Sequence, residues 1–148
     1  MANIEQIKKL REETGLSVIE CQKALKEADG DSEAAKEILK KWGKDFAQTR
    51  TDRAVKQGIV DAYVHCGSKI GVMIELRCES DFVAKSDDFK NLAHELCLQI
   101  AAISPDDMPL LDQPWIRDQA KTIKDLISEY IAKLGENITL EKFVRYAM

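Results

Sequence analysis

The fold is decided by residues 60–78, which read VDAYVHCGSKIGVMIELRC. Apolar side chains alternate with others on both sides of a turn at residues 67–69, as expected for two antiparallel strands that each bury one face. The expected buried faces comprise Val60, Ala62, Val64 and Cys66 in the first strand, and Ile70, Val72, Ile74, Leu76 and Cys78 in the second. Tyr63 and Met73 then belong to the opposite face of the hairpin.

The remainder of the second half supplies a third strand and two helices. Residues 138–146 read as a strand, although their alternation is imperfect. Ser86 is the expected cap of one helix, and a second helix runs from a cap at Thr122 to a stop at Gly135. Because an isolated hairpin is marginally stable, we expect the late strand to pair with it. Residues 104–121 read as irregular. The fold class is therefore α+β: a three-stranded antiparallel sheet with helices on one face.

Residues 3–43 predict three short helices. Asn3, Ser17 and Asp31 are the expected caps, and Ser17 with Glu20 forms a capping box. Gly43 is expected to end the third helix. The expected domains are a three-helix bundle of the ubiquitin-associated type over 1–43, a linker over 44–57, and an α+β core domain of dimerisation type over 58–148.

Composition excludes several classes of protein. The 148 residues carry a net charge of −4, with a pI near 5.3, and their basic residues are dispersed, so no direct nucleic-acid binding is expected. Apolar runs are too short for a membrane span, and no signal pattern precedes the first helix, so we expect a cytoplasmic protein. The four cysteines form no Cys-x-x-Cys pair, so no metal site is expected. Buried, unreactive cysteines are the preferred interpretation.

No known catalytic motif is present. The chain lacks a glycine-rich phosphate loop, His-Glu-x-x-His and Gly-x-Ser-x-Gly. His65 and Cys66 are neighbours on an expected strand and would point to opposite faces. We therefore expect a protein that is not an enzyme and that needs no cofactor. A thiol enzyme would require an exposed cysteine of low pKa among Cys21, Cys66, Cys78 and Cys97.

The connection after the hairpin contains an unusual pair, Asp81-Phe82. Connections usually carry small polar turn residues. Phe82 could close the end of its own core, or it could reach outward as an aromatic anchor for a partner. Asp81 opposes burial of the pair, because a buried unpaired charge is costly. The flanking strand and helix also have complete apolar stripes without Phe82.

Three blocks of sequence support a resemblance to a known family. The first has IKKLREETG at residues 7–15 and CQKAL at 21–25, and the second is GVMIELRCESDFVA at 71–84. The third combines QPW at 113–115, AKLGENI at 132–138 and FVR at 143–145. In these blocks, which span nearly the whole chain, the sequence resembles the elongation factor Ts family, the guanine-nucleotide exchange factors of elongation factor Tu, in a short form with one core subdomain.

The resemblance implies a mechanism and a set of contacts. Asp81 and Phe82 would press against the nucleotide domain of elongation factor Tu, where the ring wedges near the magnesium site and GDP is released. Ser80 and Val83 flank that pair and are included in the expected contact set. The N-terminal bundle would bind the same domain through the exposed start of its second helix, with Val18, Ile19 and Lys23 as candidate contacts.

The sequence departs from the family pattern in several places. Ser80 replaces the usual threonine, which preserves the hydroxyl. The connection at residues 104–111 is far shorter than the helical excursion that short family members usually have there. A homodimer is a further expectation, through the uncovered face of the sheet, where we place Tyr63, Met73 and Phe143. The alternative function is a ubiquitin-associated-type adaptor whose core domain serves only as a dimer scaffold.

Overall fold

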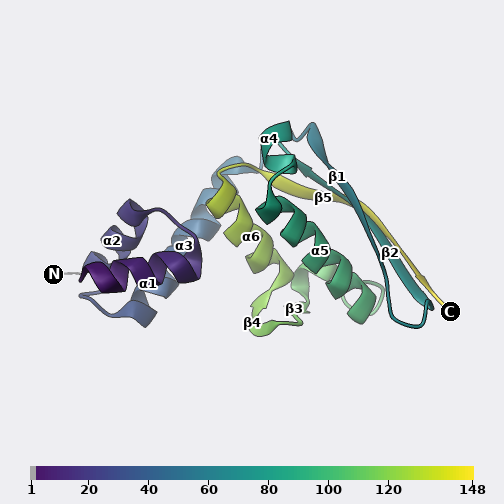
Figure 1. Ribbon diagram of the computed structural model, residues 1–148, viewed down its shortest axis with the longest axis horizontal. Coiled ribbons are helices and arrows are strands. Elements are labelled where there is room, and N and C mark those ends of the chain that lie inside the picture. The colour runs from purple at the N-terminus through teal and green to yellow at the C-terminus, as the bar shows by residue number, and fades with distance from the viewer. Residues whose placement is uncertain (1–2) are drawn as a thin grey trace.

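In the computed structural model, which describes residues 3–148, the chain begins with three helices and ends with a sheet (Figure 1). The helices are α1 (Ile4–Thr14), α2 (Val18–Glu27) and α3 (Ser32–Arg50). Residues 1–2 of the expected first domain lie outside the described residues. The predicted caps are confirmed, because the side chains of Asn3, Ser17 and Asp31 each accept backbone hydrogen bonds at a helix start.

The third helix does not end at Gly43, as the sequence predicted, but continues to Arg50. Gly43 is buried, and a Cβ placed on it would lie 3.4 Å from the Cβ of Ala132. The glycine therefore lies where α3 packs closely against another helix, and this tertiary contact outweighs its low helix propensity. Residues 44–50 of the expected linker are thus helical.

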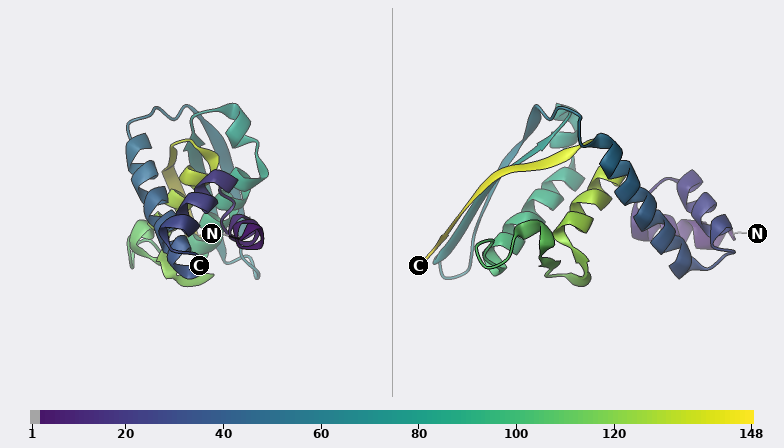
Figure 2. Two further views of the ribbon diagram at one scale, coloured as in Figure 1. Left: turned by 90° about the vertical axis from the view of Figure 1, so that its left-hand side faces the viewer. Right: turned by 180° about the vertical axis from the view of Figure 1, so that it is seen from behind.

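Helix α3 contributes to two separate hydrophobic cores. Leu39 packs in the core of the bundle, together with Leu10, Cys21, Ala24, Leu25 and Ala35. Ala47 packs in the core of the second half, with Phe46 beside it. The two cores lie at opposite ends of the long axis of the molecule, and α3 spans the space between them (Figure 2). The division into separately folding domains stays a prediction.

The second half is a three-stranded antiparallel sheet with helices on one face, as predicted. Its strands are ordered β1-β2-β5, with bounds Gln57–Val64, Ile70–Cys78 and Ile138–Ala147. The helices are the single turn α4 (Asp81–Ala84), α5 (Asp87–Ala102) and α6 (Ile123–Leu134). α5 packs on β1 and β2, and the opposite face of the sheet is uncovered (Figures 1 and 2).

The face of β1 that packs inward is opposite to the one predicted. Tyr63 pairs with Val72, and its ring lies edge-on to His94 of α5, whereas Val60 and Val64 are exposed on the uncovered face. A three-residue turn at 67–69 would have paired Cys66 with Ile70. The backbone N–H of His65 instead donates to the carbonyl of Ile70 (2.8 Å), so the loop has four residues. That shift of one residue exchanges the two faces of the strand.

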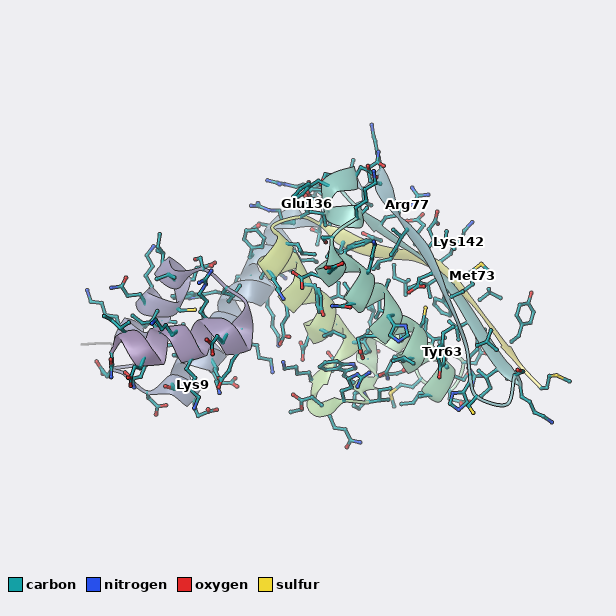
Figure 3. All side chains as sticks on the ribbon, in the orientation of Figure 1. Lys9, Tyr63, Met73, Arg77, Glu136 and Lys142 are labelled. Carbon is teal, nitrogen blue, oxygen red and sulfur yellow. The ribbon has the colours of Figure 1, made fainter. Side chains whose placement is uncertain are left out.

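Strand β5 contains a bulge that explains its imperfect alternation. Leu140 pairs with Leu76 and Lys142 pairs with Glu75, so Glu141 has no partner on β2. After the bulge, Phe143 pairs with Ile74 and lies on the helix-bearing face. The expectation that Tyr63 and Phe143 lie on the uncovered face is therefore wrong, whereas Met73 is on that face. Figure 3 shows Tyr63 beside α5 and Met73 projecting away from the helices.

The segment between α5 and α6 is more ordered than the sequence predicted. It contains a short 3₁₀ helix, η1 (Leu110–Asp112), and a small hairpin of β3 (Pro114–Trp115) and β4 (Asp118–Thr122). Two fully buried amides hold it against α5. Gln99 Nε2 donates to Gln113 Oε1 (3.0 Å) and to the carbonyl of Pro114 (3.1 Å), and Gln99 Oε1 accepts from the N–H of Ile116 (2.9 Å).

The second amide closes the short connection itself. Nε2 of Gln113 donates to the carbonyl oxygens of Met108 (2.8 Å) and Ile103 (3.4 Å). Both amide groups are therefore fully hydrogen-bonded, as burial requires. They pair the carbonyl groups of the short connection that follows α5, although Nε1 of Trp115 in the same segment is buried without a partner.

We expect the Gln113→Ala variant to lose about 2 kcal/mol of unfolding free energy, because it leaves an N–H of Gln99 and two carbonyl groups without partners. Urea denaturation followed by circular dichroism measures the loss. Gln119→Ala, at an exposed position of β4, is the matched control and should be neutral. Equal stability of the two variants would show that the buried amide pair does not hold this segment.

Candidate functional site

The Asp81-Phe82 pair lies on α4, a single helical turn between β2 and α5, where the sequence suggested a plain connection. The Ser80 side chain accepts a hydrogen bond from the N–H of Val83 (3.3 Å) and so caps the turn. Val83 is only 6% exposed and Ala84 only 1%, so both pack into the core. Phe82 is 86% exposed.

The outward direction of Phe82 follows from the geometry of one turn. Val83 and Ala84 occupy the inward side of α4, so the residue before them must project to the other side. An exposed aromatic ring makes no contribution to the core. Burying its apolar surface against a partner would stabilise the complex. The geometry therefore favours an anchor over a ring that closes its own core.

Asp81 has an ion-pair partner at the residue that follows α4. Its Oδ2 lies 2.6 Å from Nζ of Lys85, and this contact raises the pKa of the lysine. Both side chains are mostly exposed, so the pair contributes little to stability. Asp81 is thus presented to solvent beside Phe82 with its charge partly balanced.

The candidate contacts around Phe82 have different roles. Val83 is buried, so its side chain holds α4 to the core and cannot touch a partner in this conformation. Ser80 is half-buried, and its hydroxyl donates to Glu136 Oε2 (2.6 Å). Nothing in the sequence indicated that residues 81–84 form a turn that buries Val83, and a partner contact at Val83 stays a prediction.

Glu136 is a residue for which the sequence suggested no role. Its Oε1 accepts hydrogen bonds from the backbone N–H groups of Glu79 (3.1 Å) and Ser80 (2.9 Å). Figure 3 places Glu136 beside α4, in the loop between α6 and β5. Because 56 residues separate Glu136 from Ser80, no local pattern could reveal the contact; the only signal was its place in the AKLGENI block.

The second group of candidate residues lies on α2. Val18 is 48% exposed, Ile19 is 64% exposed, and Lys23 is also at the surface. Val18 borders a groove of about 600 Å³ between α1 and α2, whose lining includes Ile4, Ile7, Lys8 and Arg11. Glu12 also lines the groove, so its charged rim is mixed, and its apolar lining suits a partner surface with an apolar centre and a polar rim.

The two groups of residues do not form one site. Figure 1 places α2 at the end of the molecule that carries the bundle, whereas α4 lies above the second core. A partner must therefore be wide enough to contact two separate surfaces. That requirement is met by a macromolecule and not by a small ligand.

Three of the four cysteines are buried, as preferred from the sequence. Burial raises the pKa of Cys78 to about 11 and that of Cys97 to about 12, and it also raises the pKa of Cys21. These thiols are neutral near pH 7 and are poor nucleophiles. Cys66 is exposed, which corrects the expectation for that residue, because the four-residue loop places it at the tip of the hairpin.

Residues 3–148 offer neither a metal-ligand cluster nor a membrane-spanning helix. They contain no group of three or more His, Cys, Asp and Glu side chains placed to hold a metal ion. In the same part of the chain, no helix has both the length and the apolar character that a bilayer span needs.

The fold thus consists of two small hydrophobic cores, with the candidate contact residues exposed on two separate surfaces. Comparisons with known proteins specify the family. A family model described as "Elongation factor TS" matches residues 79–148, which include α4, Glu136 and β5. The match does not include the N-terminal bundle or the β1–β2 hairpin.

Curated relatives extend the similarity over nearly all of the chain. Elongation factor Ts of Thermoanaerobacter sp. is 39% identical over 192 positions, covering 99% of this chain and 94% of the relative. The proteins of the same name from Coprothermobacter proteolyticus and Thermotoga neapolitana are each 40% identical over 188 positions, covering 96% and 97% of this chain. The chain belongs to the elongation factor Ts family, and the adaptor alternative is not favoured.

This chain is shorter than the relatives it matches. The alignment with the Thermoanaerobacter protein spans 192 positions against a chain of 148 residues, so at least 44 positions of the relative have no counterpart here. The chain still covers 94% of that relative, so the difference is an internal deletion and not a missing half.

A thiol reagent should distinguish Cys66 from the other three cysteines. At pH 8 we expect one fast-reacting thiol per native chain and four after unfolding, because the raised pKa values and burial protect Cys21, Cys78 and Cys97. Absorbance of the released thiolate measures the count. In Cys66→Ser the fast reaction should disappear; a persistent fast thiol would contradict the described burial.

Proposed function

We propose that this chain is a guanine-nucleotide exchange factor for elongation factor Tu, that it is not an enzyme, and that Phe82 is its wedge. The observation that carries the proposal is the 86% exposure of Phe82 on a turn whose next two residues are buried. A flexible loop would lose side-chain and backbone freedom on binding. A ring carried on an anchored turn loses less, so more of its burial energy is available to act on the partner.

The proposed mechanism requires no chemical step. An exchange factor binds the nucleotide-free partner more tightly than the GDP-bound partner, and by linkage it weakens GDP binding by the same factor. A ring that fits only when the magnesium site of the partner is displaced provides that difference in affinity. Asp81 would accompany the ring, and its carboxylate would repel the phosphate groups of GDP.

The bundle supplies affinity in this proposal. Val18, Ile19 and Lys23 would contact the same partner domain and hold the chain in place while Phe82 enters. The two surfaces then have separable effects. Loss of Phe82 lowers the maximal exchange rate, and loss of Ile19 raises the concentration needed for half-maximal exchange. The proposed function implies a cytoplasmic location, because bacterial translation elongation takes place in the cytoplasm.

We expect Phe82→Ala to lower the maximal rate of stimulated GDP release by about thirtyfold, the effect of losing a central aromatic anchor. Unfolding free energy should change by less than about 0.5 kcal/mol, because the ring is exposed. Stopped-flow release of fluorescent GDP from elongation factor Tu measures the rate. Ile116→Ala removes another exposed apolar side chain, in the loop of the β3–β4 hairpin, and should be neutral.

Two results would contradict the role of Phe82. One is an unchanged maximal rate for Phe82→Ala at saturating concentrations of the chain. The other is a comparable loss for Ile116→Ala, which would indicate a general effect of surface substitutions. Ile19→Asp provides the comparison for affinity, and it should leave the maximal rate close to that of the unsubstituted chain.

We also propose a homodimer through the uncovered face of the sheet. That face carries exposed apolar side chains from all three strands: Val60, Val64, Met73, Val144 and Tyr146. The charges of Glu75, Arg77 and Lys142 on this face sum to only +1; Arg77 Nη2 lies 3.1 Å from Glu75 Oε1, and Lys142 is opposite Glu75 on the neighbouring strand. A nearly neutral apolar face can pack on a copy of itself about a two-fold axis without opposing like charges.

Met73→Asp should convert the dimer to a monomer, because Met73 lies on the central strand and each copy would bring its charge into the interface. Sedimentation equilibrium from about 1 to 100 μM measures the mass. Leu111→Asp places the same charge at an exposed position away from this face and should leave the dimer intact. An unsubstituted chain that remains monomeric at 100 μM would contradict the dimer.

A further inference from the structure

We infer that Glu136 is a positioning residue for Phe82: its carboxylate clamps the start of α4 and thereby fixes the direction in which the exposed ring projects. The inference rests on the proposed function of Phe82 and extends it to a residue in a different segment. Glu136 lies in the loop between α6 and β5, where its side chain is half-buried against the start of α4.

The clamp consists of three hydrogen bonds from one short segment. Oε1 of Glu136 accepts from the N–H groups of Glu79 (3.1 Å) and Ser80 (2.9 Å), and Oε2 accepts from the hydroxyl of Ser80 (2.6 Å). Hydrogen bonds to an ionised carboxylate are about twice as strong as neutral ones. One side chain thus determines the path of the chain where β2 ends and α4 begins.

A second carboxylate makes the reciprocal contact. Oε2 of Glu79 accepts from the N–H of Asn137 (3.0 Å), so each loop places a glutamate on the backbone of the other. Asn137 is buried, and its Nδ2 donates to the carbonyl of Arg53 (2.9 Å). The guanidinium of Arg53 lies 3.5 Å from Oε1 of Glu79. Three segments distant in sequence therefore meet at the base of α4.

The clamp reaches Phe82 through the residues on either side of it. Ser80 is held by Glu136, and its hydroxyl oxygen accepts from the N–H of Val83 (3.3 Å). The thiol of Cys78 also donates to the carbonyl of Ser80 (3.2 Å). Phe82 lies between Ser80 and Val83 and is 86% exposed, so the backbone sets the direction of its Cα–Cβ bond while little packing restricts its rotamer. Movement of the Ser80 backbone would therefore turn the ring.

We expect the fold to persist without this clamp, because Cys78 pairs with Ile138 in the sheet and Val83 and Ala84 are buried in the core. A residue that only stabilised the fold would alter global unfolding. A positioning residue instead alters the order of one turn and has no effect once the ring it positions is removed.

The first experiment uses the free chain and needs no partner. In Glu136→Ala, hydrogen–deuterium exchange of the Glu79, Ser80 and Val83 amides should lose about tenfold or more of its protection, while amides in the middle of α5 stay unchanged. Glu136→Gln keeps one carbonyl oxygen for the two N–H groups and should retain most of the protection. Glu141→Ala, at an exposed position of β5, is the matched control.

The second experiment is a double-mutant cycle on stimulated GDP release. Glu136→Ala alone should lower the maximal rate about tenfold, with Glu136→Gln intermediate. In the Phe82→Ala background, Glu136→Ala should cause less than a twofold further loss, because there is no ring left to position. Independent, multiplicative losses would overturn the inference, and so would unchanged amide protection.

The two experiments separate failure of the inference from failure of the proposed function. If the unsubstituted chain does not accelerate GDP release, the exchange-factor proposal fails, and the amide protection still decides whether Glu136 holds the turn. If GDP release is accelerated and Glu136→Ala matches the unsubstituted chain in both experiments, the inference fails and the role of Phe82 stands.

Discussion

The arrangement of this molecule depends on the packing of α3 against α6. Gly43 allows the two helices to approach closely at Ala132, and Lys44 Nζ lies 3.1 Å from Oδ1 of Asp125 beside that contact. Partial burial alone would raise the pKa of Asp125, but hydrogen bonds from Thr122 and Lys44 lower it below its ordinary value. The carboxylate therefore stays charged at neutral pH and bonds both helices. Because α3 belongs to both cores, this one contact sets the distance between the α2 surface and Phe82.

That distance matters because the proposed function needs two surfaces at once. Binding of the partner at α2 positions the ring on α4 only if the connection between α2 and α4 is rigid. A continuous helix is such a link, whereas a flexible linker of the expected length would allow the two contacts to form independently. The clamp at Glu136 serves the same purpose at shorter range, since it fixes the turn that carries the ring.

Local sequence rules predicted much of the fold. They failed where contacts between residues far apart in the sequence determine the structure. The caps at Asn3, Ser17 and Ser86 depend on neighbours within three positions, so the sequence revealed them. Which face of β1 points inward depends on whether the hairpin loop has three or four residues. The alternation of apolar residues does not specify that length. The sequence predicts a helix stop at Gly43, and only the tertiary structure shows that this glycine instead allows close packing against Ala132. At the site, the residue pattern left the direction of Phe82 open and the family resemblance favoured exposure, whereas the burial of Val83 and the contact from Glu136 required the tertiary structure.

Differential affinity is the central claim, and it can be measured directly. The dissociation constant of this chain for elongation factor Tu should be determined by titration calorimetry in the absence of nucleotide and at saturating GDP. We predict that GDP weakens binding of the chain by a large factor, and that saturating chain weakens GDP binding by the same factor, as linkage demands. Equal affinity of the chain for the nucleotide-free and GDP-bound forms would contradict an exchange factor, however tightly the two proteins bind.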